Sequence, residues 1–204
     1  MQTTILLCRH AEVHNPERIL YGRLPGFGLS EAGWRQAERL AAALAAEPIS
    51  AIYTSPLLRA RQTADCIHRL HPTARLILAE PLNEVFTSWQ GKRWAELGGA
   101  RYYEPPADPG DETMLDLVAR LQSFVAHVVH ARRGQTVVAV SHGDPIAIFL
   151  MALFGAPLSE QELRRHQTYY PALASINRLV FADDLTLVSR DYLDLRQLPE
   201  AARL

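Results

Sequence analysis

Short apolar runs alternate along the chain with longer segments in which apolar residues recur every three or four positions. Runs of this length are typical of strands buried on both faces, and the longer period predicts helices with one buried face. The predicted strands cover residues 5–8, 51–54, 76–78 and 136–140, followed by a hairpin at 176–181 and 185–188. One predicted helix begins at Ser30, and three others cover residues 56–70, 113–131 and 145–154. This alternation predicts an α/β fold, a three-layer sandwich whose central, mostly parallel sheet is flanked by helices.

Two segments show neither period. Residues 11–29 contain the pair Asn15-Pro16 and several glycines, which predicts a loop. Residues 80–112 are longer and hold Trp89, Trp94 and four prolines. An irregular connection of this length inside a compact domain usually has a function. We therefore predict a lid-like loop region within a single domain that spans residues 1–204.

Composition and charge narrow the possible partners. The 204 residues carry 21 Lys and Arg against 22 Asp and Glu, which offers no general attraction to nucleic acid or to an anionic membrane. Cys8 and Cys66 are too few for a disulfide framework. The first residues do not resemble a signal peptide, and no apolar run is long enough for a membrane span. These features predict a cytoplasmic protein that binds neither nucleic acid nor membranes, and they leave the oligomeric state open.

The predicted strands end in residues that can carry chemistry. Arg9 and His10 follow the first strand, Arg59 comes shortly after the second, and His142 follows the fourth. In open parallel sheets, ligands bind beyond the carboxyl ends of the strands. We therefore expect these two arginines and two histidines to meet at one place.

Such a group of side chains suits a phosphate monoester. The ester carries nearly two negative charges, and the guanidinium groups of Arg9 and Arg59 offer paired donors to them. The helix after His142 adds free N–H groups, which makes Gly143 a further candidate. His10 becomes a nucleophile if a backbone carbonyl holds its Nδ1–H and leaves Nε2 free. Since these groups supply the positive charge, the sequence predicts neither a metal nor a cofactor.

The alkoxide that leaves needs a proton, and Glu84 is the candidate donor. Desolvation beneath an apolar lid would raise the pKa of its carboxyl group and keep it protonated near neutrality. Asp144 is the rival donor because it follows His142 at a helix start. As a helix cap, Asp144 would accept N–H groups that favour its charged form, which makes it the poorer acid.

Five segments in this order along residues 5 to 145 resemble the motifs of the histidine phosphatase superfamily, which includes the cofactor-dependent phosphoglycerate mutases. The segments are Arg9-His10-Ala11-Glu12, residues 29–37 (Leu-Ser-Glu-Ala-Gly-Trp-Arg-Gln-Ala), residues 55–64 (Ser-Pro-Leu-Leu-Arg-Ala-Arg-Gln-Thr-Ala), Leu82-Asn83-Glu84 with Trp89-Gln90-Gly91, and Val140-Ser141-His142-Gly143. The resemblance implies a phosphoglycerate mutase-like fold. It also implies His10 as nucleophile, Arg9, Arg59 and His142 as phosphate pocket, and Glu84 as proton donor.

Three positions depart from the family pattern. Ala11 stands where glycine is usual and adds a methyl group beside the nucleophile. Val13 replaces a threonine or serine and so removes a hydroxyl that would face phosphate. Asn15 comes one residue earlier than the usual asparagine, and it is a further candidate for phosphate contact.

The favoured function is hydrolysis of a small phosphomonoester through a phosphohistidine on His10. Phosphoryl transfer of the mutase type is an alternative, although the segment after Glu80 looks too short for the insertions that cap the mutase site. A non-catalytic, regulatory member of the family would normally have lost its histidines or Arg59. A zinc site at His10 and His14 would need a helix, whereas Asn15-Pro16 predicts a loop.

Specificity is expected to come from residues around the phosphate pocket. The candidates are Arg18, Tyr21 and Arg23, the aromatic stretch at 86–103, and the group Arg164, Arg165, His166 and Tyr169. The phosphate-binding groups do not distinguish among sugar phosphates, nucleotides, phosphoglycerates and phosphorylated cofactor precursors.

Overall fold

The structure, a computed structural model, describes residues 1–98, 103, 106, 108–165 and 169–197. Six strands form one sheet in the order β3-β2-β4-β1-β5-β6. Their bounds are β1 Gln2–Arg9, β2 Ile49–Thr54, β3 Arg75–Leu78, β4 Thr136–Ser141, β5 Ile176–Ala182 and β6 Leu187–Leu193. The first four strands are parallel, and β5 is antiparallel to both β1 and β6. The predicted α/β fold with a mostly parallel sheet is confirmed.

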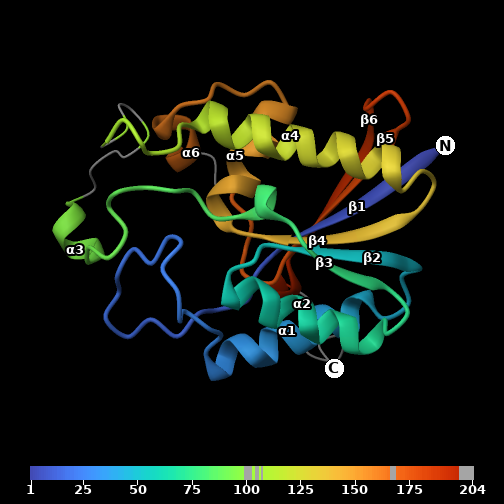
Figure 1. Ribbon diagram of the computed structural model, residues 1–204, viewed down its shortest axis with the longest axis horizontal. Helices are drawn as coiled ribbons and strands as arrows, with labels where there is room; N and C mark the ends of the chain where they lie inside the picture. Colours follow the sequence, from blue (N-terminus) through green and yellow to red (C-terminus); the bar gives the residue numbers. More distant parts are fainter. Residues whose placement is uncertain (99–102, 104–105, 107, 166–168, 198–204) are drawn as a thin grey trace.

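Helices cover both faces of this sheet (Figure 1). One face carries α1 (Glu31–Leu44) and α2 (Leu58–Leu70), and the other carries α4 (Met114–Ala131) and α5 (Gly143–Leu153). The connections contain the short helices α3 (Trp94–Leu97) and α6 (Glu160–Arg165) and the 3₁₀ turns η1 (Glu80–Leu82) and η2 (Leu195–Gln197). None of the described helices combines the length and the apolar character that crossing a membrane requires.

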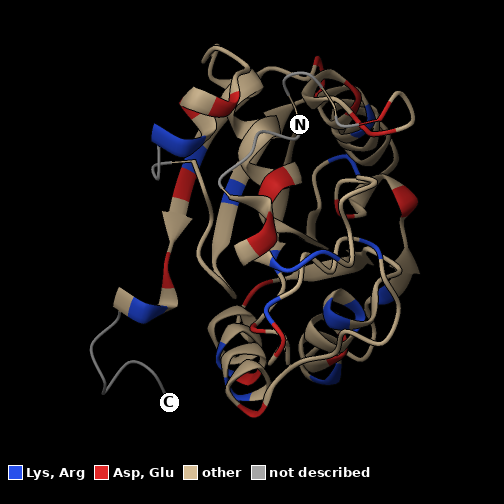
Figure 2. Cartoon of the chain, turned by 90° about the vertical axis from the view of Figure 1, so that its left-hand side faces the viewer, with Lys and Arg blue, Asp and Glu red and all other residues tan. Residues whose placement is uncertain are grey.

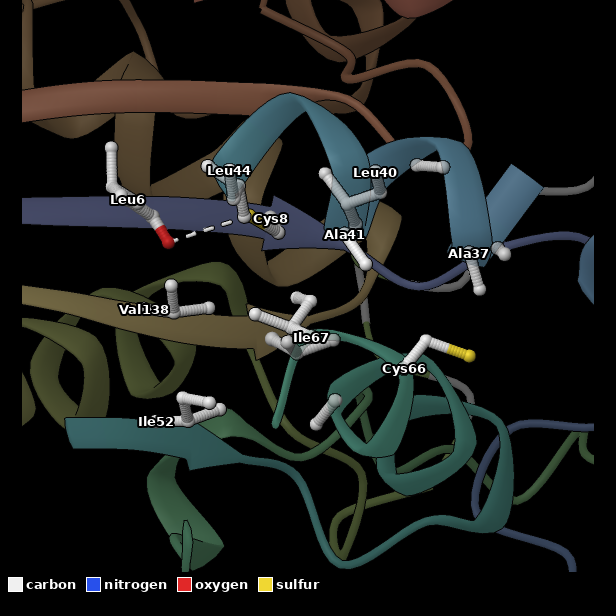
Figure 3. Packing of buried hydrophobic residues seen from close by; sticks show 14 of the residues in the cluster. Leu6, Cys8, Ala37, Leu40, Ala41, Leu44, Ile52, Cys66, Ile67 and Val138 are labelled. Carbon is white, nitrogen blue, oxygen red and sulfur yellow. Dashed lines mark hydrogen bonds between the residues drawn. The ribbon is translucent and has the colours of Figure 1, made fainter. Parts of the chain in front are cut away.

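The alternation of side chains along β1 divides the core into two parts. Leu6 and Cys8 pack with α1 and α2 and with Val138 of β4 (Figure 3). Ile5 and Leu7 point to the opposite face and pack with α4 and α5. A strand buried on both faces has to be apolar at every position, which explains the uninterrupted run in the sequence. Packing on both faces fixes the register of the strand and therefore the position of the residues that follow it.

Helix α2 begins later than predicted. It starts at Leu58 rather than at Pro56, and its N-cap Leu57 makes no side-chain capping bond. The hydroxyl of Ser55, the predicted cap, accepts from the N–H of Leu57 at 3.3 Å and has a second partner, the ring of His142, at 2.8 Å. The prediction failed because a tertiary partner uses the serine that the sequence offers as a cap.

Helix α5 begins earlier than predicted. It starts at Gly143, with His142 at the N-cap position, so Asp144 lies inside the first turn and does not cap the helix. The Asp-Pro pair still marks the end of the strand correctly. The Asp144 side chain lines the neighbouring cleft.

The two irregular segments are joined by backbone hydrogen bonds. The N–H of Leu20 donates to the carbonyl of Lys92 at 2.8 Å, that of Gly91 to Leu20 at 2.8 Å, and that of Trp94 to Arg18 at 3.0 Å. Both segments lie beyond the carboxyl ends of the parallel strands, at the left of Figure 1. Figure 2 shows acidic and basic residues interspersed over the face that it presents, in line with the balanced charge of the chain.

Candidate active site

Three strand ends meet at one edge of the sheet. β1 ends in Arg9, and the following residue, His10, donates its N–H to the carbonyl of Ser141 at the end of β4, 3.0 Å away. Arg59 lies in the first turn of α2 and is fully buried. The ring of His142 lies 5.1 Å from that of His10, centroid to centroid. The fold therefore brings these two arginines and two histidines together.

The hydrogen bonds of His10 show which of its nitrogens carries the proton. Its Nδ1 lies 2.7 Å from the carbonyl oxygen of Ala11, which only accepts, so Nδ1 is the protonated nitrogen. Its Nε2 accepts from Nε of Arg59 at 3.3 Å. Burial, together with the charges of Arg59 and Arg9, lowers the pKa of His10 well below its usual value and keeps the ring neutral. A neutral imidazole with its lone pair on Nε2 is the form that attacks phosphorus.

Each arginine is anchored by a backbone carbonyl and retains a further donor. Arg59 donates through Nη2 to Gly22 at 2.9 Å, and its guanidinium carbon lies 4.6 Å from the centre of the Tyr21 ring. Arg9 donates through Nη1 to Pro171 at 2.8 Å. In the part of the chain that the structure describes, Arg9 Nε and Arg59 Nη1 are buried without a hydrogen-bond partner. Buried donors of this kind are costly, and an oxyanion would satisfy both.

A relay of side chains orients His142. Asn83 donates its amide N–H to Glu80 at 2.6 Å, which leaves Oδ1 of Asn83 to accept the hydroxyl proton of Ser55 at 2.9 Å. The Ser55 oxygen therefore accepts from Nε2–H of His142, 2.8 Å away. Nδ1 of His142 is buried and has no hydrogen-bond partner among the described residues. Burial and the charge of Arg59 lower the pKa of His142 well below its usual value.

Glu84 lies at the edge of this group. Its Oε1 accepts from the N–H of Val85 at 2.9 Å, and its Oε2 lies 3.9 Å from Nη2 of Arg59 and 3.8 Å from Nδ1 of His142. Burial, and after it the negative charge of Asp144, raises the pKa of Glu84 to about 7. A carboxylic acid with such a pKa is about half protonated at neutral pH, so a substantial fraction of the chains can donate a proton to an alkoxide.

Asp144 has other partners than those predicted. Its two oxygens accept the hydroxyl protons of Tyr103 at 2.7 Å and of Tyr170 at 2.8 Å. The prediction that N–H groups at a helix cap hold this carboxylate is wrong, because the helix starts one residue before it. Two phenolic hydroxyl groups bind this carboxylate instead.

The site opens into a cleft of about 360 Å³. A Cβ atom at Gly143 would lie 2.6 Å from the Tyr170 hydroxyl and 3.1 Å from the guanidinium carbon of Arg9. Only glycine allows the end of α5 to approach the cleft this closely. Two positions that depart from the family pattern differ in their placement. Ala11 packs in the core with α1 and α2 and is not among the described residues that line the cleft, whereas Val13 is one of them.

The weaker candidates differ in their placement. Tyr21 lines the cleft, whereas Arg18 is exposed and is not among its described lining residues. Asn15 lines the cleft, but its side-chain amide exchanges two hydrogen bonds with the backbone of Ile19, at 2.9 and 3.2 Å, and so closes the loop.

Arg23 supports the site from outside. It donates through Nε to the carbonyl of Glu84 at 2.7 Å and through Nη2 to the carboxylate of Glu112 at 2.7 Å. Glu112 also accepts from Arg120, whose Nη1 donates to the carbonyl of Pro81 at 2.6 Å. This network holds the backbone around Glu84. The positive charge of Arg23 is paired with Glu112 and is therefore not available to a substrate.

In the last group of specificity candidates, the tyrosine that lines the cleft is Tyr170 rather than the predicted Tyr169. Arg164 and Arg165 are exposed on α6, and the Tyr169 ring stacks on Phe154 at 6.0 Å. Tyr170, which the sequence analysis missed, is the tyrosine that reaches the cleft. His166, like Tyr102 of the aromatic stretch, lies outside the described residues.

A metal ion fits this site less well than an anion does. One ligand atom each from His10, Glu84 and His142 lies within 4.8 Å of the others, close enough to share an ion. However, Nε of Arg59 lies 3.3 Å from Nε2 of His10, and its Nη2 lies 3.9 Å from Oε2 of Glu84. The guanidinium charge opposes a further cation there and favours an anion.

The sequence relatives decide the family. Residues 5–191 match the histidine phosphatase superfamily, branch 1. The chain belongs to this superfamily. An uncharacterised protein of Mycobacterium tuberculosis, Rv0525, is 36% identical over 90% of this chain and 92% of its own length. Phosphoserine phosphatase 1 of Hydrogenobacter thermophilus is 32% identical over 76% of this chain and 78% of its own length.

A solved structure shares the fold of this chain. YhfR of Bacillus stearothermophilus superposes with a TM-score of 0.80 at 27% identity and covers 91% of this chain and 94% of its own. A 2,3-bisphosphoglycerate-dependent phosphoglycerate mutase of Brucella anthropi is 28% identical over 216 aligned residues, which include 95% of this chain and all of the mutase.

Proposed function

We propose that this member of the histidine phosphatase superfamily hydrolyses a small phosphomonoester, without a metal, through a phosphohistidine on His10. The observation that carries the proposal is that three residues beside His10 each keep a buried polar atom without a hydrogen-bond partner. These atoms are Arg9 Nε, Arg59 Nη1 and His142 Nδ1, which have no hydrogen-bond partner within the described ranges of the chain. The two arginine atoms donate N–H groups, and His142 Nδ1 donates once it is protonated, so together they can bind the oxygens of a phosphoryl group in transfer.

The first half-reaction forms a bond from Nε2 of His10 to phosphorus and breaks the bond from phosphorus to the ester oxygen. The electron pair of that bond stays on the oxygen, which takes the proton of Glu84 and leaves as the alcohol. His10 then carries the phosphoryl group, and its Nδ1–H remains bound to the carbonyl of Ala11. The guanidinium groups of Arg9 and Arg59 stabilise the charge on the transferring oxygens.

In the second half-reaction the Glu84 carboxylate takes a proton from water, whose oxygen attacks phosphorus. The bond from phosphorus to His10 breaks, inorganic phosphate leaves, and Glu84 is protonated again. The same carboxyl group thus acts as acid and then as base. Its pKa of about 7 suits both steps near neutral pH.

The relay behind His142 sets a condition on phosphate binding. With Nε2–H committed to Ser55, a neutral His142 presents only a lone pair at Nδ1. A phosphate dianion offers acceptors and no donor, so it binds well only if Nδ1 gains a proton. The ester therefore binds either as a monoanion, whose hydroxyl donates to Nδ1, or as a dianion together with one proton, which leaves His142 charged beside the phosphoryl oxygens.

Hydrolysis is favoured over phosphoryl transfer by the described walls of the cleft. A bisphosphoglycerate would bring a second phosphate and a carboxylate, which need cations beyond those that hold the first phosphate. Arg18 is exposed away from the described lining, and Arg23 is bound to Glu112. A regulatory, non-catalytic role is disfavoured because His10, Arg59 and His142 are all present with their partners.

Release of phosphate from a panel of phosphorylated metabolites tests this proposal directly. The expected result is accumulation of inorganic phosphate with at least one small ester. Interconversion of phosphoglycerates that depends on 2,3-bisphosphoglycerate, without net release of phosphate, would identify a mutase instead.

Activity is expected to survive removal of divalent metals. Arg9, Arg59 and His142 supply the charge stabilisation that a metal would otherwise give. Hydrolysis of a chromogenic phosphomonoester, measured before and after dialysis against EDTA, should keep the same rate. A loss of rate that zinc or magnesium restores would contradict the metal-free mechanism.

The pH profile is expected to depend on the leaving group. Glu84 must be protonated to assist a poor leaving group, so kcat/KM for an alkyl phosphate should fall about tenfold per pH unit above about 7. An aryl phosphate, whose phenolate leaves unaided, should lack this limb. Because the pKa of His10 is held well below its usual value, its protonation should not reduce the rate near pH 6.5. Taking the ratio of the two substrates cancels the ionisation of the phosphate itself.

A further inference from the structure

Five of the described residues that line the cleft have apolar side chains, which together form an apolar wall. Val13 and Leu20 come from the first irregular segment, Val85 and Trp94 from the second, and Leu173 from the segment before β5. Leu20 is 8% and Val85 2% exposed, whereas Val13 and Leu173 are half-buried and Trp94 is 49% exposed. A leaving group that covers this wall removes apolar surface from water on both sides.

This wall is held in place before any ligand arrives. The hydrogen bonds that join Leu20 to Gly91 and Lys92, and Trp94 to Arg18, tie the two segments to each other. Arg23 adds a bond from its N–H to the side chain of Gln90 at 2.9 Å. A surface that is already ordered costs little conformational entropy on binding.

The charges around the cleft disfavour an acidic leaving group. Apart from Arg9, which faces the phosphate, the charged side chains among the described lining residues are the carboxyl groups of Glu12, Glu84 and Asp144. Glu12 accepts a hydrogen bond from Ser30 at 2.6 Å, which fixes it on this side of the cleft. A carboxylate on the leaving group would lose hydration against the apolar wall and meet like charge.

We infer that the preferred substrates are phosphomonoesters of uncharged alcohols that carry an apolar chain or ring, and that esters with a second anionic group are poor substrates. This inference rests on the proposed phosphatase activity and extends it from the phosphate to the alcohol. It also gives Val13 a role. Where the family pattern has a hydroxyl, this chain has two methyl groups that extend the apolar wall.

Two esters of equal shape test the inference. The apolar one is 4-methylpentyl phosphate, and the acidic one is 4-phosphooxybutanoate, in which a carboxylate replaces the branched end. Both release a primary alkoxide, so their chemistry at phosphorus is matched. The expected kcat/KM is at least about tenfold higher for the apolar ester. Along the series from methyl to pentyl phosphate, kcat/KM should rise about threefold for each methylene that reaches the wall.

A change of charge in the wall should reverse the preference. Leu173→Arg is expected to shift the ratio of the two kcat/KM values by at least about tenfold toward the acidic ester. The matched control is Leu115→Arg, since Leu115 is 69% exposed on α4 and is not among the described residues that line the cleft. This control should leave the ratio unchanged. Circular dichroism should show that both variants fold.

The possible outcomes separate the inference from the proposed function. Phosphate release from 4-phosphooxybutanoate at a rate equal to or above that from 4-methylpentyl phosphate would overturn the inference and leave the phosphatase activity standing. An unchanged ratio in Leu173→Arg would also overturn it. If the folded protein releases phosphate from no ester at all, the proposed function fails and the inference fails with it.

Discussion

Replacement of His10 by alanine is expected to reduce phosphate release by on the order of 10⁴-fold or more, the scale seen when a nucleophile is removed from an enzyme. No other side chain of the described site presents a neutral imidazole lone pair toward the two arginines with its other nitrogen held by a carbonyl. Brief reaction of the wild-type chain with a radiolabelled ester should leave a phosphoryl adduct that is labile in acid and stable in base. The His10→Ala variant should carry none.

Two controls separate loss of chemistry from loss of structure. His10→Ala retains Arg9, Arg59 and His142, so it should still bind inorganic phosphate in a calorimetric titration. His127→Ala removes an exposed histidine of α4 and should leave the rate unchanged. An adduct that resists acid, or one that persists in His10→Ala, would indicate a different nucleophile.

Replacement of Glu84 by glutamine is expected to separate poor from good leaving groups. A general acid contributes about 10²–10⁴-fold when the leaving oxygen needs a proton. The variant should therefore lose about that factor on an alkyl phosphate and at least about tenfold less on an aryl phosphate. Steady-state rates with the two substrates measure the difference. The fall of the alkyl rate above pH 7 should disappear in the same variant.

Asp144 supplies the matched comparison for Glu84. Its oxygens are bound by the hydroxyls of Tyr103 and Tyr170, and its charge contributes to the raised pKa of Glu84. Asp144→Asn should therefore lower the pH at which the alkyl rate falls, without a selective loss on the alkyl ester at low pH. Equal losses on both esters in Glu84→Gln, with the selective loss in Asp144→Asn, would transfer the acid role to Asp144.

The elements predicted correctly are those that their own residues determine. The run at 136–140 lies within β4 because both faces of that strand are buried, and Ser30 caps α1 through a bond to the N–H of Gly33. Polar residues at strand ends were less informative. Thr3 and Thr4 extend β1 beyond the predicted run because the sheet pairs them, which single-sequence patterns do not show.

The same distinction holds for the site. His10, Arg59 and His142 could be placed together because parallel strands deliver their carboxyl ends to one edge. Tyr103 and Tyr170 come from segments without any period, so nothing in the sequence distinguished Tyr170 from its neighbour. The relay through Asn83 and Ser55 joins residues that lie 28 positions apart, and only the folded chain reveals it.

The buried polar atoms of Arg9, Arg59 and His142 that lack a hydrogen-bond partner make the protein's thermal stability depend on its own product. Groups removed from water without a partner reduce the free energy of unfolding, and phosphate restores it by binding only to the folded chain. Inorganic phosphate therefore both competes with the substrate and protects the fold from heat. The free energy of unfolding is therefore lower when the catalytic centre is empty, and bound phosphate restores part of it for as long as it stays in the site.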